Sequence, residues 1–419
     1  MPNSDFKPTS PSLSSLFWLF LKLGATAFGG FMALISVIEN LIVKQRQLLT
    51  HEDILDGLSL ASILPGPVAI DVVAYIGYRL RGWAGACVTT FAVLLPSFVL
   101  VVTISIIYLR MGAVPAVDQA FQGFIPAVVA IILNAAWRTS RKVIKSWQEV
   151  VIMAVAIALL NAIGGFYLTV GVIIGSGILG WLWFDKFNYQ SSFLLKQIPQ
   201  GKADWRNDQP TLKQKLAWFS QFKTTLIIIL LLAVLVIAAG LLQPLLNRDS
   251  LAKLFFTFSG MSLTLFGGGY VFIPLIQELV VQNYSWVTQT QFANAITIGQ
   301  ITPGPILISV AFIGYAVKGI LGAVVATASI FAPPAILMVA CSHILEEIKH
   351  SEAIQAALKG LRPAIIGTIF TAAIVIGQTA TVHWATWLIF VLAVVAQWKL
   401  RMAVVLIIPV AGILGVLFY

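Results

Sequence analysis

Charged residues are scarce in this sequence, and so are the side chains that build metal and disulfide sites. Only 10% of the 419 residues are charged, against about a quarter in a soluble globular chain, while 59% are hydrophobic. Four histidines and two cysteines occur, and Cys87 and Cys341 lie within apolar runs. We therefore expect inert buried thiols, no disulfide, no metal site and no cofactor.

Catalytic and nucleotide-binding motifs are missing as well. The sequence contains no P-loop, no HExxH zinc motif, no GxSxG turn and no Cys/His cluster. Neither ATP hydrolysis nor metal or serine chemistry is supported, and no catalytic residue is predicted. The chain is not expected to be an enzyme.

Long apolar runs fill most of the chain instead. One of them, residues 226–242, reads LIIILLLAVLVIAAGLL, and such runs can cross a bilayer core that needs about 20 residues. The net charge of +10, from 26 Lys and Arg minus 16 Asp and Glu, sits mostly in short connections. That pattern is typical of cytoplasmic loops rather than of nucleic-acid binding. The sequence predicts an all-α polytopic protein of the lipid bilayer.

The sequence contains two copies of one unit, residues 16–184 and 254–419. Pro65 and Pro303 are 303 − 65 = 238 positions apart, and this offset aligns ILPGP with ITPGP and LFWLFLKLGATAFGG with LFFTFSGMSLTLFGG. After the PGP motif the offset is 237, and it aligns IGYRLRGWAGA with IGYAVKGILGA. Near the ends, GILGWLWF matches GILGVLFY. A repeat of this kind predicts one structural unit built twice.

Two segments separate the copies. Residues 185–223 form a polar linker with seven positive charges, so we expect it to be cytoplasmic. Residues 224–247 form an extra apolar helix without a counterpart in the first copy. One additional crossing turns the second copy over, which predicts two inverted repeats, as in many secondary transporters. Residues 1–15 are expected to be a cytoplasmic N-terminal segment.

Each copy divides into six apolar segments. With the spacer helix, the chain is predicted to have about 10–13 membrane segments. In the first copy these are 16–43, 54–78, 83–107, 115–136, 150–163 and 167–184. If the PGP segment crosses the membrane, the loop with Lys44 and Arg46 falls outside, against the tendency of positive charges to stay inside. Whether PGP marks a broken span or the tip of a re-entrant hairpin stays open.

Each copy contains two helix breaks, an FGG motif in its first span and PGP in its second. Non-helical backbone at membrane depth needs protein or water around it, and a restarting helix offers free N–H groups and a positive dipole end to an anion. The alternative is that the glycines only allow close packing and the prolines only kink. The residues predicted to bind the substrate are Gly29, Gly30, Pro65, Gly66, Pro67, Gly267, Gly268, Gly269, Pro303, Gly304 and Pro305, with Lys22 as a nearby cation or a snorkelling side chain.

Ionisable side chains at membrane depth are costly and are therefore functional candidates. Asp71 is matched in the second copy only by uncharged residues around Ser309, so it is the preferred candidate for proton coupling or for an ion pair, with Arg79 as its partner. Glu39 and Glu278 could also exchange a proton, although an interfacial position explains Glu39 slightly better. A surface-anchor role is the alternative for Arg79. The pairs Thr50–Asp53 and Thr288–Gln291 are read as structural helix caps.

The duplicated pattern FGG, PGP, IGY and G-x-x-G-A, with FGGGY-x-x-x-PL in the second copy, resembles the chromate transporter family of prokaryotic inner-membrane proteins. The resemblance covers both copies. It implies a carrier in the plasma membrane of a prokaryote that exports chromate, a tetrahedral dianion, by proton antiport and confers chromate resistance. Phe31 and Leu34 stand where the family has proline and histidine, and backbone ligands suit sulfate too. Sulfate therefore stays open as a competing substrate.

Other functions also remain open at this stage. An anion channel, an uptake carrier for sulfate-type oxyanions and a non-transporting scaffold all fit a helical membrane protein. A carrier predicts saturable, pH-dependent flux, whereas a channel predicts flux that follows the voltage. The expected partners are a small inorganic oxyanion, protons and lipid, and the choice between monomer and homodimer stays open.

Overall fold

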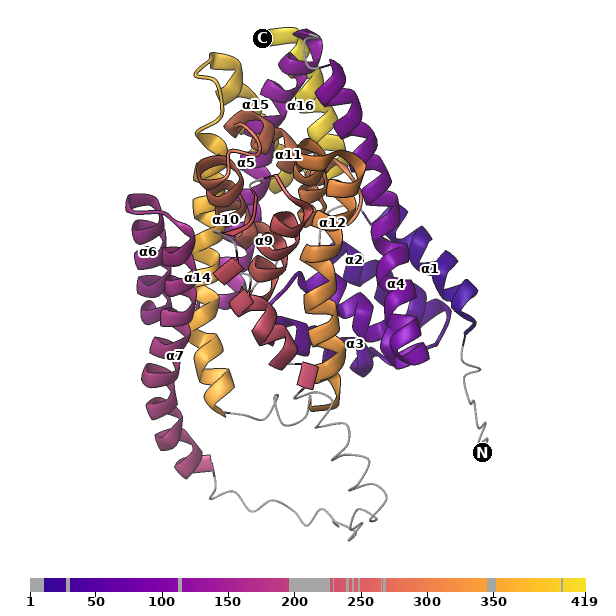
Figure 1. Cartoon of the computed structure of the whole chain (residues 1–419). Helices are drawn as coiled ribbons and strands as arrows, with labels where there is room; N and C mark the ends of the chain where they lie inside the picture. Colours follow the sequence, from indigo (N-terminus) through magenta and orange to yellow (C-terminus); the bar gives the residue numbers. More distant parts are fainter. Residues whose placement is uncertain are drawn as a thin grey trace.

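The structure is a computed structural model of the whole chain, and it describes residues 11–419 apart from several gaps. The gaps are 28–30, 112–114, 196–226, 229, 239–240, 243–244, 248, 265, 267–268, 345–351 and 401. Every regular element of the described part is a helix, which confirms the all-α prediction (Figure 1). Gly29, Gly30, Gly267, Gly268 and most of the linker lie outside the described residues.

The helices of the first copy begin at Leu13. They are α1 (Leu13–Thr26), α2 (Phe31–Ile38), the π-helix η1 (Glu39–Gln45), α3 (His51–Ile63), α4 (Val68–Met111), α5 (Pro115–Val143), α6 (Trp147–Ala162) and α7 (Phe166–Leu195). The last of these continues into the segment that was predicted to be linker. Of the predicted spacer, residues 230–238 are helical.

The helices of the second copy follow the same order. They are α9 (Leu251–Thr264), η3 (Gly269–Val271), α10 (Phe272–Gln277), the π-helix η4 (Glu278–Asn283), α11 (Gln289–Ile301), η5 (Ile306–Ser309), α12 (Val310–Cys341), η6 (Ser342–Ile344), α14 (Glu352–Gly377), α15 (Trp384–Trp398) and α16 (Val404–Phe418). The capping boxes predicted at Thr50 and Thr288 are both formed.

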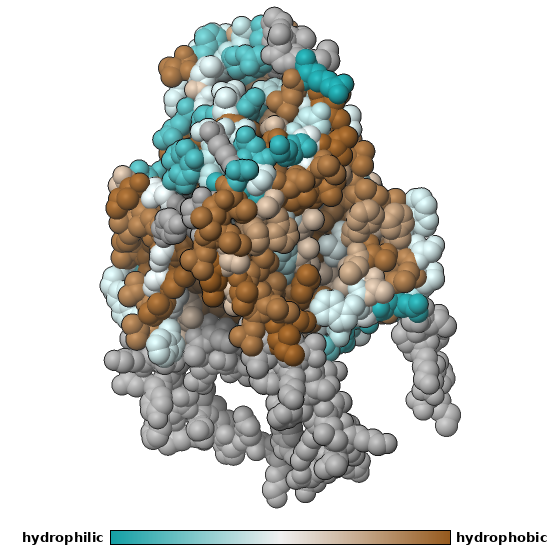
Figure 2. Space-filling view, in the orientation of Figure 1, coloured by the Kyte–Doolittle hydropathy of each residue, from teal (hydrophilic) through white to brown (hydrophobic). Residues whose placement is uncertain are grey.

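The surface is that of a multi-pass membrane protein. Four of the described helices are long and apolar enough to cross a bilayer, namely Val68–Arg110, Asp118–Val143, Ile306–Cys341 and Gln355–Gly377. Large apolar side chains such as Trp147, Leu321 and Trp387 are exposed, and Figure 2 shows hydrophobic residues over most of the visible face below a hydrophilic end. Such a surface is stable against lipid tails but not against water.

Each of the helices α4 and α12 consists of two arms that fold back on each other. The backbone leaves the helical region at Arg81 and Gly82, where the φ of Gly82 is 60°. The Thr89 hydroxyl donates a hydrogen bond to the Val73 carbonyl at 3.2 Å, although these residues would lie about 24 Å apart in a continuous helix. The first arm of α4 (68–80) therefore runs antiparallel to its second arm (83–111). The same turn at Gly319, with a φ of 61°, separates the arms 310–317 and 320–341 of α12.

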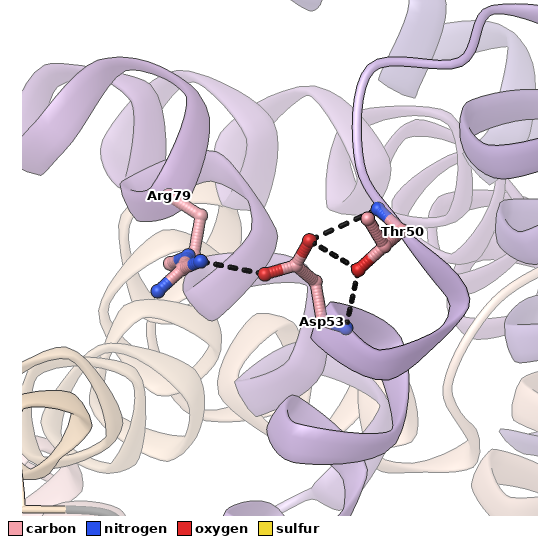
Figure 3. Close-up of polar contacts among 3 residues, drawn as sticks. All are labelled: Thr50, Asp53 and Arg79. Atoms are coloured by element: carbon pink, nitrogen blue, oxygen red, sulfur yellow. Dashed lines mark hydrogen bonds and ion pairs between the residues drawn. The ribbon is translucent and has the colours of Figure 1, made fainter. Parts of the chain in front are cut away.

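The first PGP motif is the tip of a hairpin. On either side of it, α3 and the first arm of α4 lie side by side, since Gly57 packs against the ring of Tyr75. Farther from the tip, Arg79 Nη2 lies 2.6 Å from Asp53 Oδ1 (Figure 3). Both pairs are centred on Gly66. The chain therefore turns back at PGP, which settles the alternative that the sequence left open.

The second PGP motif makes the same turn. Gly299, before the tip, lies against the carbonyl of Ile306 and the Cβ of Ser309, which follow the tip. Gly299 and Ser309 are equally far from Gly304 in the sequence, just as the pairs in the first copy are equally far from Gly66. Both PGP segments are therefore hairpin tips rather than kinks in continuous spans.

The hairpin changes the expected topology of the first copy. The basic cluster at the end of α5, which includes Arg138 and Arg141, is expected to be cytoplasmic. Counting back through α5 and the second arm of α4, we expect Arg81 and the base of the hairpin on the same side. On this expectation Lys44 and Arg46 also lie inside, which fits the tendency of positive charges to stay on the cytoplasmic side.

The two copies exchange their last helices. In Figure 1, α6 and α7 lie against α14 of the second copy, while α15 and α16 pack on α5 of the first. Gly180 packs directly against Gly360, and Gly123 against Gly415, because a side chain at any of these positions would overlap the facing backbone. The copies therefore form one intertwined body, and the main apolar core contains residues of both.

Polar side chains of the two copies are also hydrogen-bonded to each other inside the helix bundle. The amide of Asn134 donates to Gln397 at 2.7 Å, and the amide of Asn161 donates to Thr371 at 3.3 Å. Asn134 and Thr371 occupy matched positions, 371 − 134 = 237 apart. Each bond joins the two copies, so helices of different copies are held together by directed contacts as well as by packing.

Candidate functional site

The two PGP tips lie between the copies, each against the other copy. A Cβ at Gly66 would overlap the ring of Pro334 in the second arm of α12, and a Cβ at Gly304 would overlap the side chain of Ser97 in the second arm of α4. The φ angles of the two glycines are 131° and 103°, a region that residues with a side chain rarely adopt. Only glycine fits at either tip.

The contacts of the two tips are reciprocal. Ser97 and Pro334 are matched positions, because 97 + 237 = 334, so each tip packs against the same place on the opposite copy. Reciprocal contacts of this kind are what a two-fold relation between like units produces. The sequence predicted two half-sites and did not identify these partners.

The second tip is tied to the first copy by two hydrogen bonds. The Gly304 N–H donates to the carbonyl of Ala27 at 3.0 Å, and the Ser97 hydroxyl donates to the carbonyl of Pro303. Ala27 caps α1 immediately before the first FGG break, while Gly269, after the second break, faces Ile306. The ends of the FGG breaks that the structure describes thus lie beside the second tip.

Asp71 stands in the first turn of the arm that follows the first tip. It is fully buried, and its Oδ2 lies 2.9 Å from the point that a Cβ of Gly66 would occupy. Neither carboxylate oxygen has a hydrogen-bond partner among the described residues, and the same holds for the hydroxyl of Ser309, the matched residue. Since buried polar atoms are nearly always hydrogen-bonded, these atoms indicate a place for a ligand, water or proton.

Further polar groups near the second tip were not singled out from the sequence. Gln300 lies one turn before Pro303 and is bonded to Tyr270, while its Nε2 has no partner among the described residues. Neutral amides and hydroxyls in apolar helices give no sequence signal of their own. Only the match of Ser309 to Asp71 could have drawn attention to this side.

Glu39 lies at the base of the first hairpin rather than at its tip. Its Oε1 is 3.2 Å from Nδ1 of His51, the first residue of α3. His51 lies about 18 Å from the other end of α3, which leads into the tip. In the second copy the matched residues Gln277 and Gln289 form an amide hydrogen bond of 2.9 Å. Glu278 follows Gln277 directly, so it also belongs to a hairpin base. These positions fit the interfacial alternative.

Arg79 pairs with Asp53 and not with Asp71, so the predicted ion pair with Asp71 is wrong. Asp53 also accepts hydrogen bonds from the backbone and side chain of Thr50 (Figure 3). Burial raises the pKa of Asp53, but the bonds from Thr50 and the charge of Arg79 outweigh it and hold the pKa below its usual range. Lys22 is exposed on α1, whose buried residues include Phe20 and Leu23.

A large cavity between α4 and α12 does not suit an anion. Its volume is about 700 Å³, and apolar side chains such as Phe91, Leu94 and Phe331 dominate its lining. An oxyanion needs several convergent N–H or O–H donors, whereas the hydroxyls here are those of Thr90 and Thr327. The region of the two tips is therefore the candidate site.

An apolar helical body with two internal hairpins that meet between repeated units, and with tip polar groups that lack a partner among the described residues, characterises a multi-pass membrane protein. The family model for the chromate transporter matches residues 14–181 and, a second time, residues 252–416. The chain belongs to the chromate transporter family, which confirms the resemblance and gives the protein a role in chromate transport.

Two curated relatives match nearly the whole chain. The "Probable chromate transport protein" of Synechococcus elongatus is 31% identical over 414 residues, which are 97% of this chain and 96% of that protein. The "Chromate transport protein" of Cupriavidus metallidurans is 28% identical over 419 residues, covering 98% and 95%.

A shorter relative corresponds to part of the chain. The "Uncharacterized transporter YwrA" of Bacillus subtilis is 28% identical over 145 residues, which are 34% of this chain and 82% of that protein. No solved structure matches the chain.

Proposed function

We propose that the protein is a secondary-active carrier in the plasma membrane of a prokaryote. It exports chromate at the expense of the proton motive force and takes sulfate as a competing substrate. The observation that supports this most strongly is the reciprocal packing of the two PGP tips, beside which buried polar atoms of Asp71 and Ser309 have no partner in the described part of the chain.

The donors for a tetrahedral dianion come from the arms that follow the tips. The first N–H groups of a helix have no partner within it, and the arm that starts at Val68 directs its positive dipole end toward the first tip. The N–H groups of Ile70 and Asp71 already donate to the Pro67 carbonyl, so the donors of this arm are those of Val68 and Ala69. The Gly304 N–H already serves the Ala27 carbonyl, so we remove it from the predicted ligands. The tip glycines instead allow the close approach of backbone from both copies.

Alternating access follows from the arrangement of the repeats. With one crossing contributed by the spacer helix 224–247, the bases of the two hairpins face opposite sides of the membrane. Their tips meet near the middle, where discontinuous helices of secondary transporters bind their substrates. Rocking of one hairpin against the opposite copy would then expose the tips to either side in turn.

Chromate flux into proteoliposomes tests the proposal. A carrier gives saturable uptake that responds to an imposed pH gradient and is reduced by sulfate or molybdate, whereas a channel gives flux that follows the voltage alone. Gly66→Leu and Gly304→Leu should abolish uptake, because a side chain at either tip overlaps the other copy.

The matched control is Gly171→Leu, since Gly171 has open space around its Cβ position. This variant should transport like the wild type. Wild-type flux in both tip variants would refute the site, and absence of saturable flux in the wild type would refute the carrier.

A further inference from the structure

The two tips differ in how they are held. The second tip is fixed by the bonds from Gly304 to Ala27 and from Ser97 to Pro303. At the first tip the matched partner of Ser97 is Pro334, which has no donor, and the nearby carboxylate of Asp71 is unpartnered in the described structure. Among the described residues, the first tip is therefore the one whose unpartnered group is a carboxyl that can carry a proton.

Because of the position of Asp71, its protonation state decides whether an anion can bind at this tip. The arm from residue 68 to residue 80 is long enough to have a dipole, and Asp71 lies in its first turn with Oδ2 directed at Gly66. An ionised carboxylate there occupies the positive helix end and repels a dianion in a medium of low dielectric constant. A protonated carboxyl instead donates an O–H to an anion oxygen.

No neighbouring charge compensates Asp71 directly, because no hydrogen bond or ion pair joins it to a described residue. Arg79 is paired with Asp53, and η5 and α11, which also pack against α4, carry no titratable group. The titratable groups on the helices around it and on its own arm are Lys22 of α1, His51, Glu52, Asp53 and Asp56 of α3, Tyr315, Lys318 and Cys341 of α12, and Tyr75, Tyr78 and Arg79 of α4, with His343 of η6 bonded to Tyr78.

We propose that the first PGP tip binds its oxyanion together with one proton, which is held on Asp71. The inference rests on the proposed function, and it specifies the direction in which the proton moves relative to the anion. Anion and proton cross in the same direction as a unit of charge −1, in place of the exchange that the family resemblance implies. Export of this unit is driven by a membrane potential that is negative inside.

Calorimetric titration of the purified full-length protein with sulfate tests this, since sulfate stays a dianion from pH 6 to 9 whereas chromate itself takes up a proton. The heats are measured in buffers of different ionisation enthalpy. We expect about one proton to be taken up per sulfate at alkaline pH, and an affinity that rises about tenfold for each unit that the pH falls. Asp71→Asn should bind without proton uptake and with an affinity independent of pH.

Asp118→Asn is the matched control, because Asp118 is an exposed carboxylate that accepts a bond from Gln122; it should behave like the wild type. Proton release, or no proton exchange, in the wild type overturns the inference, and so does proton uptake that persists in Asp71→Asn. If the wild type binds neither sulfate nor chromate at any pH, the proposed function itself fails.

A second measurement needs no variant. Proteoliposomes that contain a trapped pH dye receive an inward sulfate gradient, with the potential clamped. Acidification of the lumen supports joint movement of anion and proton. Alkalinisation of the lumen, or sulfate entry without a pH change, contradicts it.

Discussion

The hydrogen bond from Ser97 to Pro303 gives a quantitative test of the contact between the copies. In Ser97→Ala, the buried carbonyl of Pro303 loses the hydroxyl donor that it receives from a helix 206 positions away in the chain. Leaving a buried acceptor without its partner costs about 1–3 kcal/mol. Because this bond and the one from Gly304 are the two that tie the second tip to the first copy among the described residues, we also expect the initial rate of chromate flux to fall several-fold.

Ser105→Ala is the control within the same helix. Ser105 is fully buried like Ser97, but its hydroxyl bonds the Val101 carbonyl one turn back in its own helix. Such a bond adds little, because that carbonyl keeps its backbone partner. Unfolding of both variants is measured by denaturant titration in mixed micelles, and flux is measured in proteoliposomes. Equal stability and equal flux of the two variants would refute the contact between Ser97 and the second tip.

Two further predictions concern the bases of the hairpins. A double-mutant cycle with Asp53→Asn and Arg79→Ala should give a coupling of about 0.2–1 kcal/mol, because the pair is partly exposed. Since folding lowers the pKa of Asp53, the stability that its charge contributes is present above its unfolded pKa and is lost as the pH falls through the lowered value. The double variant Glu39→Gln/His51→Gln should transport chromate within about twofold of the wild type, since the second copy uses an amide pair at these positions.

The outcomes that contradict these two predictions are distinct. For Asp53, the reasoning fails if the Asp53→Asn variant and the wild type differ as much in stability at pH 3 as at pH 7. For the pair of Glu39 and His51, a loss of pH-dependent flux in the amide variant would show that the base, and not the tip, carries the proton. Chromate uptake at a series of pH values decides the second case.

The sequence predicted the helical class and the family because these depend on hydropathy and on short motifs. The capping boxes were predictable for a similar reason, since Thr50 and Asp53 lie three residues apart and contact each other within one turn. The break at PGP was equally certain. The direction of the chain after the break was not predictable, because a proline and a glycine end a helix without fixing the direction of the next helix.

Tertiary contacts between distant residues decided the remaining features. The hairpin is fixed by pairs such as Asp53 and Arg79, 26 positions apart, and the site by the contacts of Ser97 and Pro334 with the opposite tips. Asp71 could be found because its match in the second copy is uncharged. The role of Ser97 could not, because a serine beside a proline in an apolar helix carries no sign of its partner.

Labelling of single cysteines in oriented vesicles tests most directly whether the hairpins enter from opposite sides. In a background without Cys87 and Cys341, a thiol is placed at two exposed positions on each hairpin base, as Glu52→Cys and Arg81→Cys in the first copy and Thr290→Cys and Lys318→Cys in the second. A reagent that cannot cross the membrane should label the first pair only from the cytoplasmic face and the second pair only from the outer face. Labelling of the two members of one pair from opposite faces would contradict the hairpin, and labelling of all four from one face would contradict the inverted repeat.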